Sequence, residues 1–390
     1  MRRVPVLVWI LAAAVARAAP PLDATAERLV GADQGVWARA EDGTVLASVA
    51  ADRPVHPASV TKIATTLALL ARLGPAHRFE TRVVGAGRLD GGTLRGDLVF
   101  EGGGDPMFLR ENALLVLLAL RDRGVRAVEG TLRTRGPFLF DWRPDPDARR
   151  LRRVLEGREG AEAWAAVAAV RPAASDGGLP GHALRFGPRP RAAAGATVLL
   201  VHRSAPLVGI LKALNCWSND VFHVFAERIG GAATVQAAAR AAVPPELAGE
   251  IHVDEPAGGG RNVRLSPRAA AALVDALAAA LATHGLALPD VLPVSGVDPG
   301  TLAHRLAGGL VVGKTGTIGS LRASALAGAV RTRRWGRVTF AVLNHGLPVP
   351  EAQRRQDAFV RALAEAGGAT AWDSPERAVP SVADAEVVGP

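Results

Sequence analysis

Apolar residues recur every three or four positions from Ile63 to Leu70, which predicts an amphipathic helix across residues 57–74. Gly74 closes that stretch, and glycine is common where helices end. Upstream, residues 28–55 read as a short helix followed by two alternating apolar and polar strands joined at a Glu-Asp-Gly turn. The pattern therefore predicts a strand pair that leads into a buried helix.

A change of pattern begins near residue 81. Short alternating runs predict strands at residues 81–87, 92–102 and 130–136 around one helix at residues 111–124. We expect residues 81–200 to form a separate lobe. The Arg/Asp/Pro-rich stretch at residues 141–160 predicts an exposed loop or helix, with a partner-binding surface as the alternative.

Helices and strands alternate again after residue 200. Helical spacing predicts helices at residues 206–215 and 266–285, and apolar runs predict strands at residues 310–316, 325–332 and 337–346. The last residues, 373–390, have neither periodicity and predict a loose tail.

Length and composition predict a soluble globular protein of one large domain with an addition, or of two domains, because the chain has 390 residues and 49% are hydrophobic. Residues 1–18 combine two arginines, an apolar stretch and a small-x-small site, which is typical of a secretory signal. A membrane anchor is the alternative. Cleavage near Ala19 or Pro20 would export the mature chain.

Charge and cysteine content narrow the possible partners. The formal charge of +9 suits an anionic polymer such as cell wall, and it equally suits a solvated surface. No basic run is interleaved with aromatic residues, so nucleic-acid binding is not favoured. The single cysteine, Cys216, cannot form a disulfide within the chain and is expected to be buried. No HExxH motif or Cys/His cluster predicts a metal site.

Lysine is rare, because Lys62, Lys212 and Lys314 are the only three in the chain. Ser59 lies three positions before Lys62, so a helix start would place the serine hydroxyl beside the amine. A partly buried lysine can act as the base that a serine nucleophile needs, whereas arginine stays protonated. The alternative is a serine-capped helix with a surface lysine.

Two further motifs are ambiguous when each is taken alone. Ser218, Asn219 and Asp220 precede an apolar run, where they indicate either a reactive serine or a plain helix cap. Lys314-Thr315-Gly316 ends an apolar strand, where it indicates either a site for a substrate carboxylate or a strand end with a turn.

The order of the three motifs favours the catalytic interpretation, since SxxK, a Ser-Asn/Asp triplet and KTG form the set found in penicillin-recognising serine enzymes. The chain resembles the D-alanyl-D-alanine carboxypeptidase/endopeptidases among the low-molecular-mass class C penicillin-binding proteins, which carry a large insertion between the first two motifs. The stretches "GDLVFEGGGDP", "HRSAPLVGILK", "KTGTIGSLRASALAGAV" and "FAVLNHG" share the likeness. It covers most of residues 30–365, while residues 140–200 match poorly.

The resemblance implies an α/β fold, in which a penicillin-binding/serine β-lactamase-like transpeptidase domain (an antiparallel sheet with helices) is interrupted by a mostly β insertion lobe. It implies that residues 19–80 and 201–372 form the catalytic domain, with residues 81–200 as the insertion lobe and residues 373–390 as the tail. It implies peptidoglycan peptides as substrates, β-lactams as covalent inhibitors and no metal or organic cofactor. The location would be periplasmic or otherwise extracytoplasmic, and a peripheral place at the membrane stays open.

The resemblance also implies roles for individual residues. Ser59 would be the acylated nucleophile, Lys62 its general base and Ser218 the relay of a proton to the leaving D-alanine. The backbone N–H groups of Ser59 and Thr317 would form the oxyanion hole. The remaining positions would bind substrate: Asp220, Lys314, Thr315, Gly316 and Thr317.

Two departures from the family pattern are visible. Its second triplet usually ends in asparagine, and Asp220 stands there; an ionised carboxylate cannot donate a hydrogen bond to a substrate carbonyl and raises the pKa of Lys62. The usual "GSGL" element is loosened around Gly258 to Gly260. Two alternatives therefore remain beside a serine DD-peptidase: a catalytically impaired muropeptide- or penicillin-binding protein, and a β-lactamase or D-amino esterase. The sequence does not separate carboxypeptidase from endopeptidase.

Overall fold

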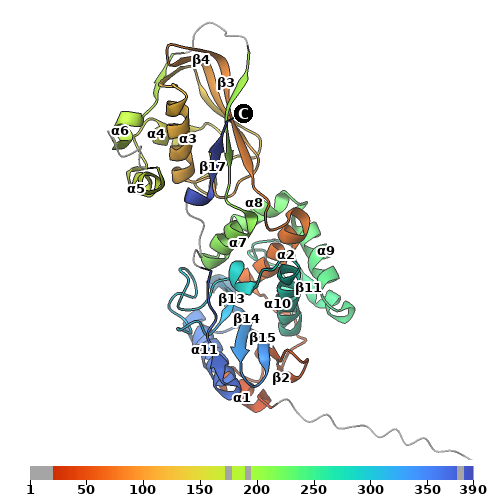
Figure 1. The fold of residues 1–390 in the computed structure, drawn as a ribbon. Helices are drawn as coiled ribbons and strands as arrows, with labels where there is room; N and C mark the ends of the chain where they lie inside the picture. Colours follow the sequence, from red (N-terminus) through yellow and green to blue (C-terminus); the bar gives the residue numbers. More distant parts are fainter. Residues whose placement is uncertain (1–20, 172–177, 189–194, 376–381, 390) are drawn as a thin grey trace, which may run out of the picture.

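The computed structural model describes residues 21–171, 178–188, 195–375 and 382–389, and it has two lobes (Figure 1). The predicted signal at residues 1–18 lies outside the described residues. In the described ranges, no helix is long and apolar enough to cross a membrane.

The first lobe is built on a six-stranded antiparallel sheet in the order β13-β14-β15-β1-β2, with β16 pairing with β14. Its strands are β1 (Gly35–Arg39), β2 (Val45–Val49), β13 (Val312–Ile318), β14 (Ala323–Thr332), β15 (Gly336–His345) and β16 (Ala369–Thr370). Its helices are α1 (Asp23–Leu29), α2 (Lys62–Leu73), α7 (Leu207–Cys216), α8 (Phe222–Glu227), α9 (Gly231–Ala242), α10 (Pro267–Ala282) and α11 (Val349–Gly367). Short strands β11 (Ile251–His252) and β12 (Arg264–Leu265) pair beside the helices.

Successive residues of a strand point to opposite faces of the sheet. Both faces of this sheet carry apolar side chains, and helices cover both. On β14, Ala325, Ala327 and Ala329 face the core that contains α2 and α10. Leu326 and Val330 face the core that contains α1 and α11. The small alanines let α10 pack closely on the sheet. The predicted α/β fold class with an antiparallel sheet is confirmed.

The second lobe holds a seven-stranded sheet in the order β17-β10-β3-β4-β5-β9, with β6 pairing with β4. Its strands are β3 (Glu80–Asp90), β4 (Thr93–Gly102), β5 (Ala127–Glu129), β6 (Leu132–Arg135), β9 (Arg185–Gly187), β10 (Thr197–Arg203) and β17 (Glu386–Val388), with a separate hairpin of β7 (Leu139–Phe140) and β8 (Arg143–Pro144). Its helices are α3 (Arg110–Asp122), α4 (Arg149–Leu155), α5 (Ala161–Val170) and α6 (Gly178–His182).

This second lobe is richer in helix than the sequence predicts. Helices α3 to α6 lie beside its sheet and share its core, so the insertion is mixed rather than mostly β (Figure 1). Residues 141–160 include α4, where Leu151, Val154 and Leu155 are buried. The prediction of an exposed loop or helix for this stretch is therefore right about a helix and wrong about its exposure, because the intervening arginines hide a short apolar face.

The chain end also differs from the predicted loose tail. Strand β17 pairs antiparallel with β10 at the edge of the second sheet. A three-residue strand is too short to show periodicity in the sequence, and β10 provides its pairing. Ser374, before this strand, donates a hydrogen bond to Asp298 of the first lobe at 2.6 Å. The terminal segment therefore connects both lobes.

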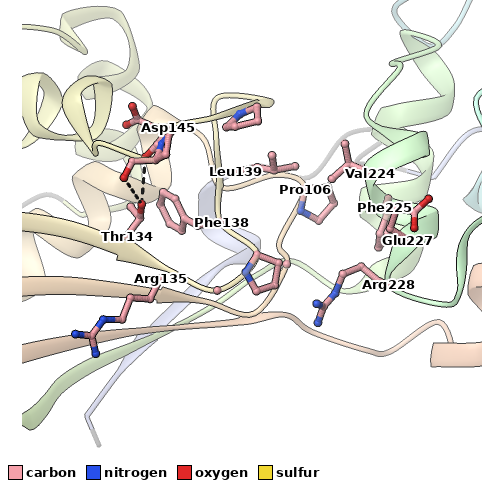
Figure 2. Close-up of a pocket in the computed structure, with 15 residues that line it drawn as sticks. Pro106, Thr134, Arg135, Phe138, Leu139, Asp145, Val224, Phe225, Glu227 and Arg228 are labelled. Carbon is pink, nitrogen blue, oxygen red and sulfur yellow. Dashed lines mark hydrogen bonds between the residues drawn. The ribbon is translucent and has the colours of Figure 1, made fainter.

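Two cavities lie where the lobes meet. Figure 2 shows the smaller, of about 510 Å³, in which Thr134, Phe138 and Leu139 of the second lobe lie across from Val224 and Phe225 of α8. The larger, of about 760 Å³, has mostly apolar walls from α3, α5, α7 and the turn that follows α7.

Asp105 lines the larger cavity and is buried, with 3% of its surface exposed. Its Oδ1 accepts a hydrogen bond from the Met107 backbone N–H at 2.8 Å, whereas its Oδ2 has no partner among the described residues. Burial raises the pKa of Asp105 to about 7, because a charged carboxylate is poorly solvated there.

Asp105→Asn should stabilise the protein at about pH 8 by a few kcal/mol, at about 1.4 kcal/mol per pKa unit, and leave it almost unchanged at about pH 4. The folded state of the wild type holds the Asp105 proton more tightly than the unfolded chain, so its stability falls as pH rises from 3.8 to about 7. Asparagine keeps the acceptor for Met107 without a charge. Urea unfolding at both pH values measures the difference, and an equal gain at both would contradict this account.

Candidate active site

Ser59 and Lys62 lie in a turn of 3₁₀-helix at Ala58–Thr61 and at the start of α2, where the sequence predicted one continuous helix. A 3₁₀-helix has three residues per turn, so positions three apart are eclipsed. The Lys62 Nζ donates to the Ser59 Oγ at 2.8 Å. Ala58 takes a left-handed conformation with φ of 47°, and its carbonyl accepts from the Thr61 hydroxyl at 2.8 Å. This tight start brings serine and lysine together.

Lys62 is fully buried. Burial lowers the pKa of Lys62, while the charges of Asp220 and Glu255 raise it and partly offset that effect. Its Nζ also donates to the Ala257 carbonyl at 2.7 Å and lies 5.9 Å from the centroid of the Phe222 ring. Burial therefore makes the neutral amine, which is the form able to accept a proton, more accessible than in an exposed lysine.

The loosened glycine element forms one wall of the site. The Glu255 carboxylate accepts from the Ala257 N–H at 2.8 Å and also from the Gly259 N–H, which fixes the loop. Gly258 has φ of 84°, and a Cβ there would lie 2.1 Å from the Ala58 carbonyl oxygen. The sequence did not point to Ala257 or Glu255. Ala257 acts through its backbone carbonyl and Glu255 by holding the loop, and neither role has a sequence motif.

Ser218 lies in the turn after α7 with a left-handed φ of 54°. Lys314 Nζ donates to the Ser218 Oγ at 2.9 Å and to the Thr315 carbonyl at 2.8 Å. Burial lowers the pKa of Lys314 well below its ordinary value, and the nearby charge of Lys62 lowers it further. The second and third motifs are therefore in direct contact through the side chains of Ser218 and Lys314.

Asp220 lies at the mouth of the site, because its side chain is 87% exposed while its Oδ1 is 3.5 Å from the Lys62 Nζ. Its neighbour Asn219 does not take its place, since the Asn219 Oδ1 accepts from the Val221 N–H at 2.9 Å at the start of α8. The exposed carboxylate is screened by water, which weakens its hold on Lys62.

Strand β13 closes the site opposite this turn. A Cβ on Gly316 would lie 2.3 Å from the Pro57 carbonyl oxygen and 3.0 Å from the Ser59 nitrogen, so only glycine allows the strand to approach the serine. Thr317 is exposed beside it. The Thr315 and Thr301 hydroxyl oxygens are 2.8 Å apart. No motif pointed to Thr301, which lies in a turn between the second and third motifs.

Cys216 is buried, as expected, and burial raises the pKa of its thiol to about 12. It therefore has little thiolate for chemistry at neutral pH. Over the described part of the chain, no three His, Cys, Asp or Glu side chains group as metal ligands. Trp217 and Asn219, the sequence neighbours of Ser218, line the larger cavity, whereas Ser218 itself is not among its lining residues.

The arrangement can carry out nucleophilic catalysis. The Ser59 hydroxyl lies beside an amine whose pKa burial lowers, so that the neutral, proton-accepting form is more accessible. The Ser218 hydroxyl lies beside a second buried amine. The β13 strand edge next to Ser59 can align an extended peptide.

Comparisons with solved structures agree on the fold. A predatory peptidoglycan endopeptidase from Bdellovibrio bacteriovorus matches with a TM-score of 0.70 and 20% identity, over 92% of this chain and 99% of that one. A penicillin G-acylated predatory endopeptidase from the same bacterium, in complex with an immunity protein, matches with a TM-score of 0.67 and 21% identity. The match covers 90% of this chain and 97% of that one. Penicillin-binding protein 4 from Haemophilus influenzae matches with a TM-score of 0.61 and 16% identity, over 88% of this chain and 98% of that one.

A family model identifies the chain more specifically. The model of the D-Ala-D-Ala carboxypeptidase 3 (S13) family matches residues 21–136 and 188–366, which is most of the chain, and the unmatched residues between them lie in the second lobe. The resemblance read from the three motifs is thereby confirmed. The chain belongs to the D-Ala-D-Ala carboxypeptidase 3 (S13) family of serine DD-peptidases.

Proposed function

We propose that the protein hydrolyses D-alanyl-D-alanine termini and D-alanyl cross-links of peptidoglycan peptides through an acyl-enzyme on Ser59. The observation that carries this proposal is the 2.8 Å contact between the Ser59 hydroxyl and the fully buried amine of Lys62. Carboxypeptidase and endopeptidase action attack the same D-alanyl carbonyl and differ only in the leaving amine. One site can therefore serve both.

In the first step, the Ser59 Oγ attacks the carbonyl carbon and its proton passes to Lys62. The carbonyl oxygen becomes negative and receives hydrogen bonds from the Ser59 and Thr317 backbone N–H groups. The C–N bond then breaks, and the departing amine takes the proton that Lys62 received from Ser59, relayed by the Ser218 hydroxyl. Water hydrolyses the resulting ester, which restores the Ser59 hydroxyl and releases the acid product.

Lys314 and Thr315 are proposed to bind the substrate's terminal carboxylate. The contact of the Lys314 Nζ with the Ser218 Oγ at 2.9 Å supports a second task, in which the ammonium orients the Ser218 hydroxyl towards the leaving group. Gly316 gives the substrate backbone room along the β13 edge. Asp220 would contact the substrate at the mouth of the site, as a hydrogen-bond acceptor only.

The catalytic unit is proposed to consist of residues 19–80 and 201–372, with residues 81–200 as the insertion. The two sheets and their separate cores support this division. Strand β17, from the end of the chain, adds to the sheet of the insertion. Peptidoglycan lies outside the cytoplasm, so we place the protein there, with residues 1–18 as its export signal. β-Lactams are proposed to acylate Ser59, by analogy with the penicillin G-acylated endopeptidase.

A catalytically impaired binding protein is the second candidate, and Asp220 is the observation that favours it. A single assay separates the two. The mature protein should release D-alanine from a peptide that ends in D-Ala-D-Ala and leave the matching L-Ala-L-Ala peptide intact. Ser59→Ala should abolish release. If the wild-type protein binds the peptide but releases no D-alanine, the catalytically impaired binding protein is the correct assignment.

Asp220→Asn should raise the rate of D-alanine release at neutral pH a few-fold and shift the acid limb of the pH–rate profile to lower pH. The carboxylate raises the pKa of Lys62, so its removal lowers that pKa and leaves more neutral amine. The amide can also donate to a substrate carbonyl. Asp254→Asn, an exposed change on the neighbouring loop, is the control. A slower Asp220→Asn enzyme would contradict this role.

Gly316→Ala should lower the rate of D-alanine release at least about a hundredfold, because the added Cβ pushes β13 away from Ser59 and misaligns the reacting groups. Gly319→Ala is the matched control, since a Cβ there meets open space. Wild-type-like rates for both variants would show that β13 does not need its close approach to Ser59.

A further inference from the structure

The third lysine of the chain lies outside all three motifs. Lys212, on α7, is 2% exposed, and its Nζ lies 2.5 Å from the Oδ2 of Asp298, whose side chain is 1% exposed. The Nζ also donates to the carbonyls of Pro289 and Leu292, at 2.7 Å each. A buried ion pair adds little net stability over an apolar pair, so this one calls for a structural or functional reason.

Asp298 holds the beginning of a loop at residues 294–306. Its Oδ2 also accepts from the Val294 N–H at 2.7 Å, and its Oδ1 accepts from the Ser374 hydroxyl at 2.6 Å. Ser295 adds two contacts, because its N–H donates to the Val311 carbonyl at 2.8 Å and its Oγ accepts from the Val311 N–H at 2.9 Å. The loop is thus fixed against the residue that precedes β13.

The same loop touches both proposed substrate-handling motifs. Gly300 has φ of 99°, and a Cβ there would lie 2.0 Å from the Cys216 carbonyl oxygen. The Thr301 N–H donates to that carbonyl at 2.9 Å, two residues before Ser218. The Thr301 Oγ1 lies 2.8 Å from the Thr315 Oγ1. One residue therefore joins the turn that carries Ser218 to the strand that carries Thr315.

We propose that Thr301 is a positioning residue that orients the Thr315 hydroxyl towards the substrate's carboxylate, and that the Lys212–Asp298 pair holds its loop in place. A hydroxyl has one proton to donate. In the free site, the Thr315 hydroxyl donates to the Thr301 Oγ1 at 2.8 Å. When a carboxylate binds, the pair reverses: Thr301 donates to the Thr315 Oγ1, and the Thr315 proton turns to the carboxylate. Without Thr301, the Thr315 hydroxyl can rotate and its proton is no longer directed. This inference rests on the proposed function of Thr315.

Thr301→Val tests the proposal, because valine keeps the shape of threonine and removes the hydroxyl. The rate constant of acylation by benzylpenicillin, followed by intact mass, should fall about tenfold, which is the worth of one hydrogen bond to a charged group. The methyl ester of benzylpenicillin has no carboxylate, so its slower acylation should change less than about twofold. Thr301→Ser should restore the rate with benzylpenicillin.

Four outcomes would overturn the proposal. An equal loss with acid and ester would mean that Thr301 acts only through general structure, and no loss with either would mean that it does not act on Thr315. A wild type that penicillin does not acylate, or a Ser59→Ala variant that it still acylates, would refute the proposed function and this inference with it.

The Lys212–Asp298 pair is tested by Asp298→Asn, which keeps an acceptor oxygen and removes the charge. We expect the same preferential loss of benzylpenicillin acylation over that of the ester, together with a lower melting temperature. A lower melting temperature with wild-type acylation of both ligands at a permissive temperature would remove the pair from the proposal and leave it a stabilising contact only.

Discussion

Two buried lysines set the central physical constraint on this protein. Lys62 and Lys314 are both fully buried near each other, where each ammonium charge is poorly solvated and each opposes the other. The structure meets this constraint by giving each amine one serine hydroxyl and one backbone carbonyl. For Lys62, burial that would be unfavourable in a structural lysine lowers the pKa and so makes the proton-accepting amine more accessible.

The surrounding backbone is shaped to supply those partners. Ala58 and Ser218 both have left-handed conformations that non-glycine residues rarely adopt, and strain of this kind gathers at functional sites. Gly258 and Gly316 let two further segments approach the Ser59 turn closely. The turn with Ser59, the glycine loop, the turn after α7 and β13 thus meet at one point, although they are far apart in the sequence.

The motifs could be read from the sequence because proton transfer and close strand packing require specific residue types. The α/β fold class followed from the family resemblance that those motifs carry. The sequence did not reveal Ala257 or Thr301, since a carbonyl and an ordinary hydroxyl become important only through tertiary contact. For residues 141–160 the prediction of an exposed loop or helix was right about the helix α4 and wrong about its exposure, because arginines interrupt its short apolar face. Strand β17 depends on pairing with β10, which local pattern cannot show.

The state of Lys62 is the most direct test of this account, and the chain is well suited to it because it has three lysines. Protein labelled with ¹³C at the lysine ε-carbon should give three side-chain signals by NMR, and Lys62→Met identifies one of them. We predict that the Lys62 signal titrates below the ordinary value of 10.5, because burial lowers its pKa. A Lys62 amine that stays protonated up to that value would contradict its role as the base.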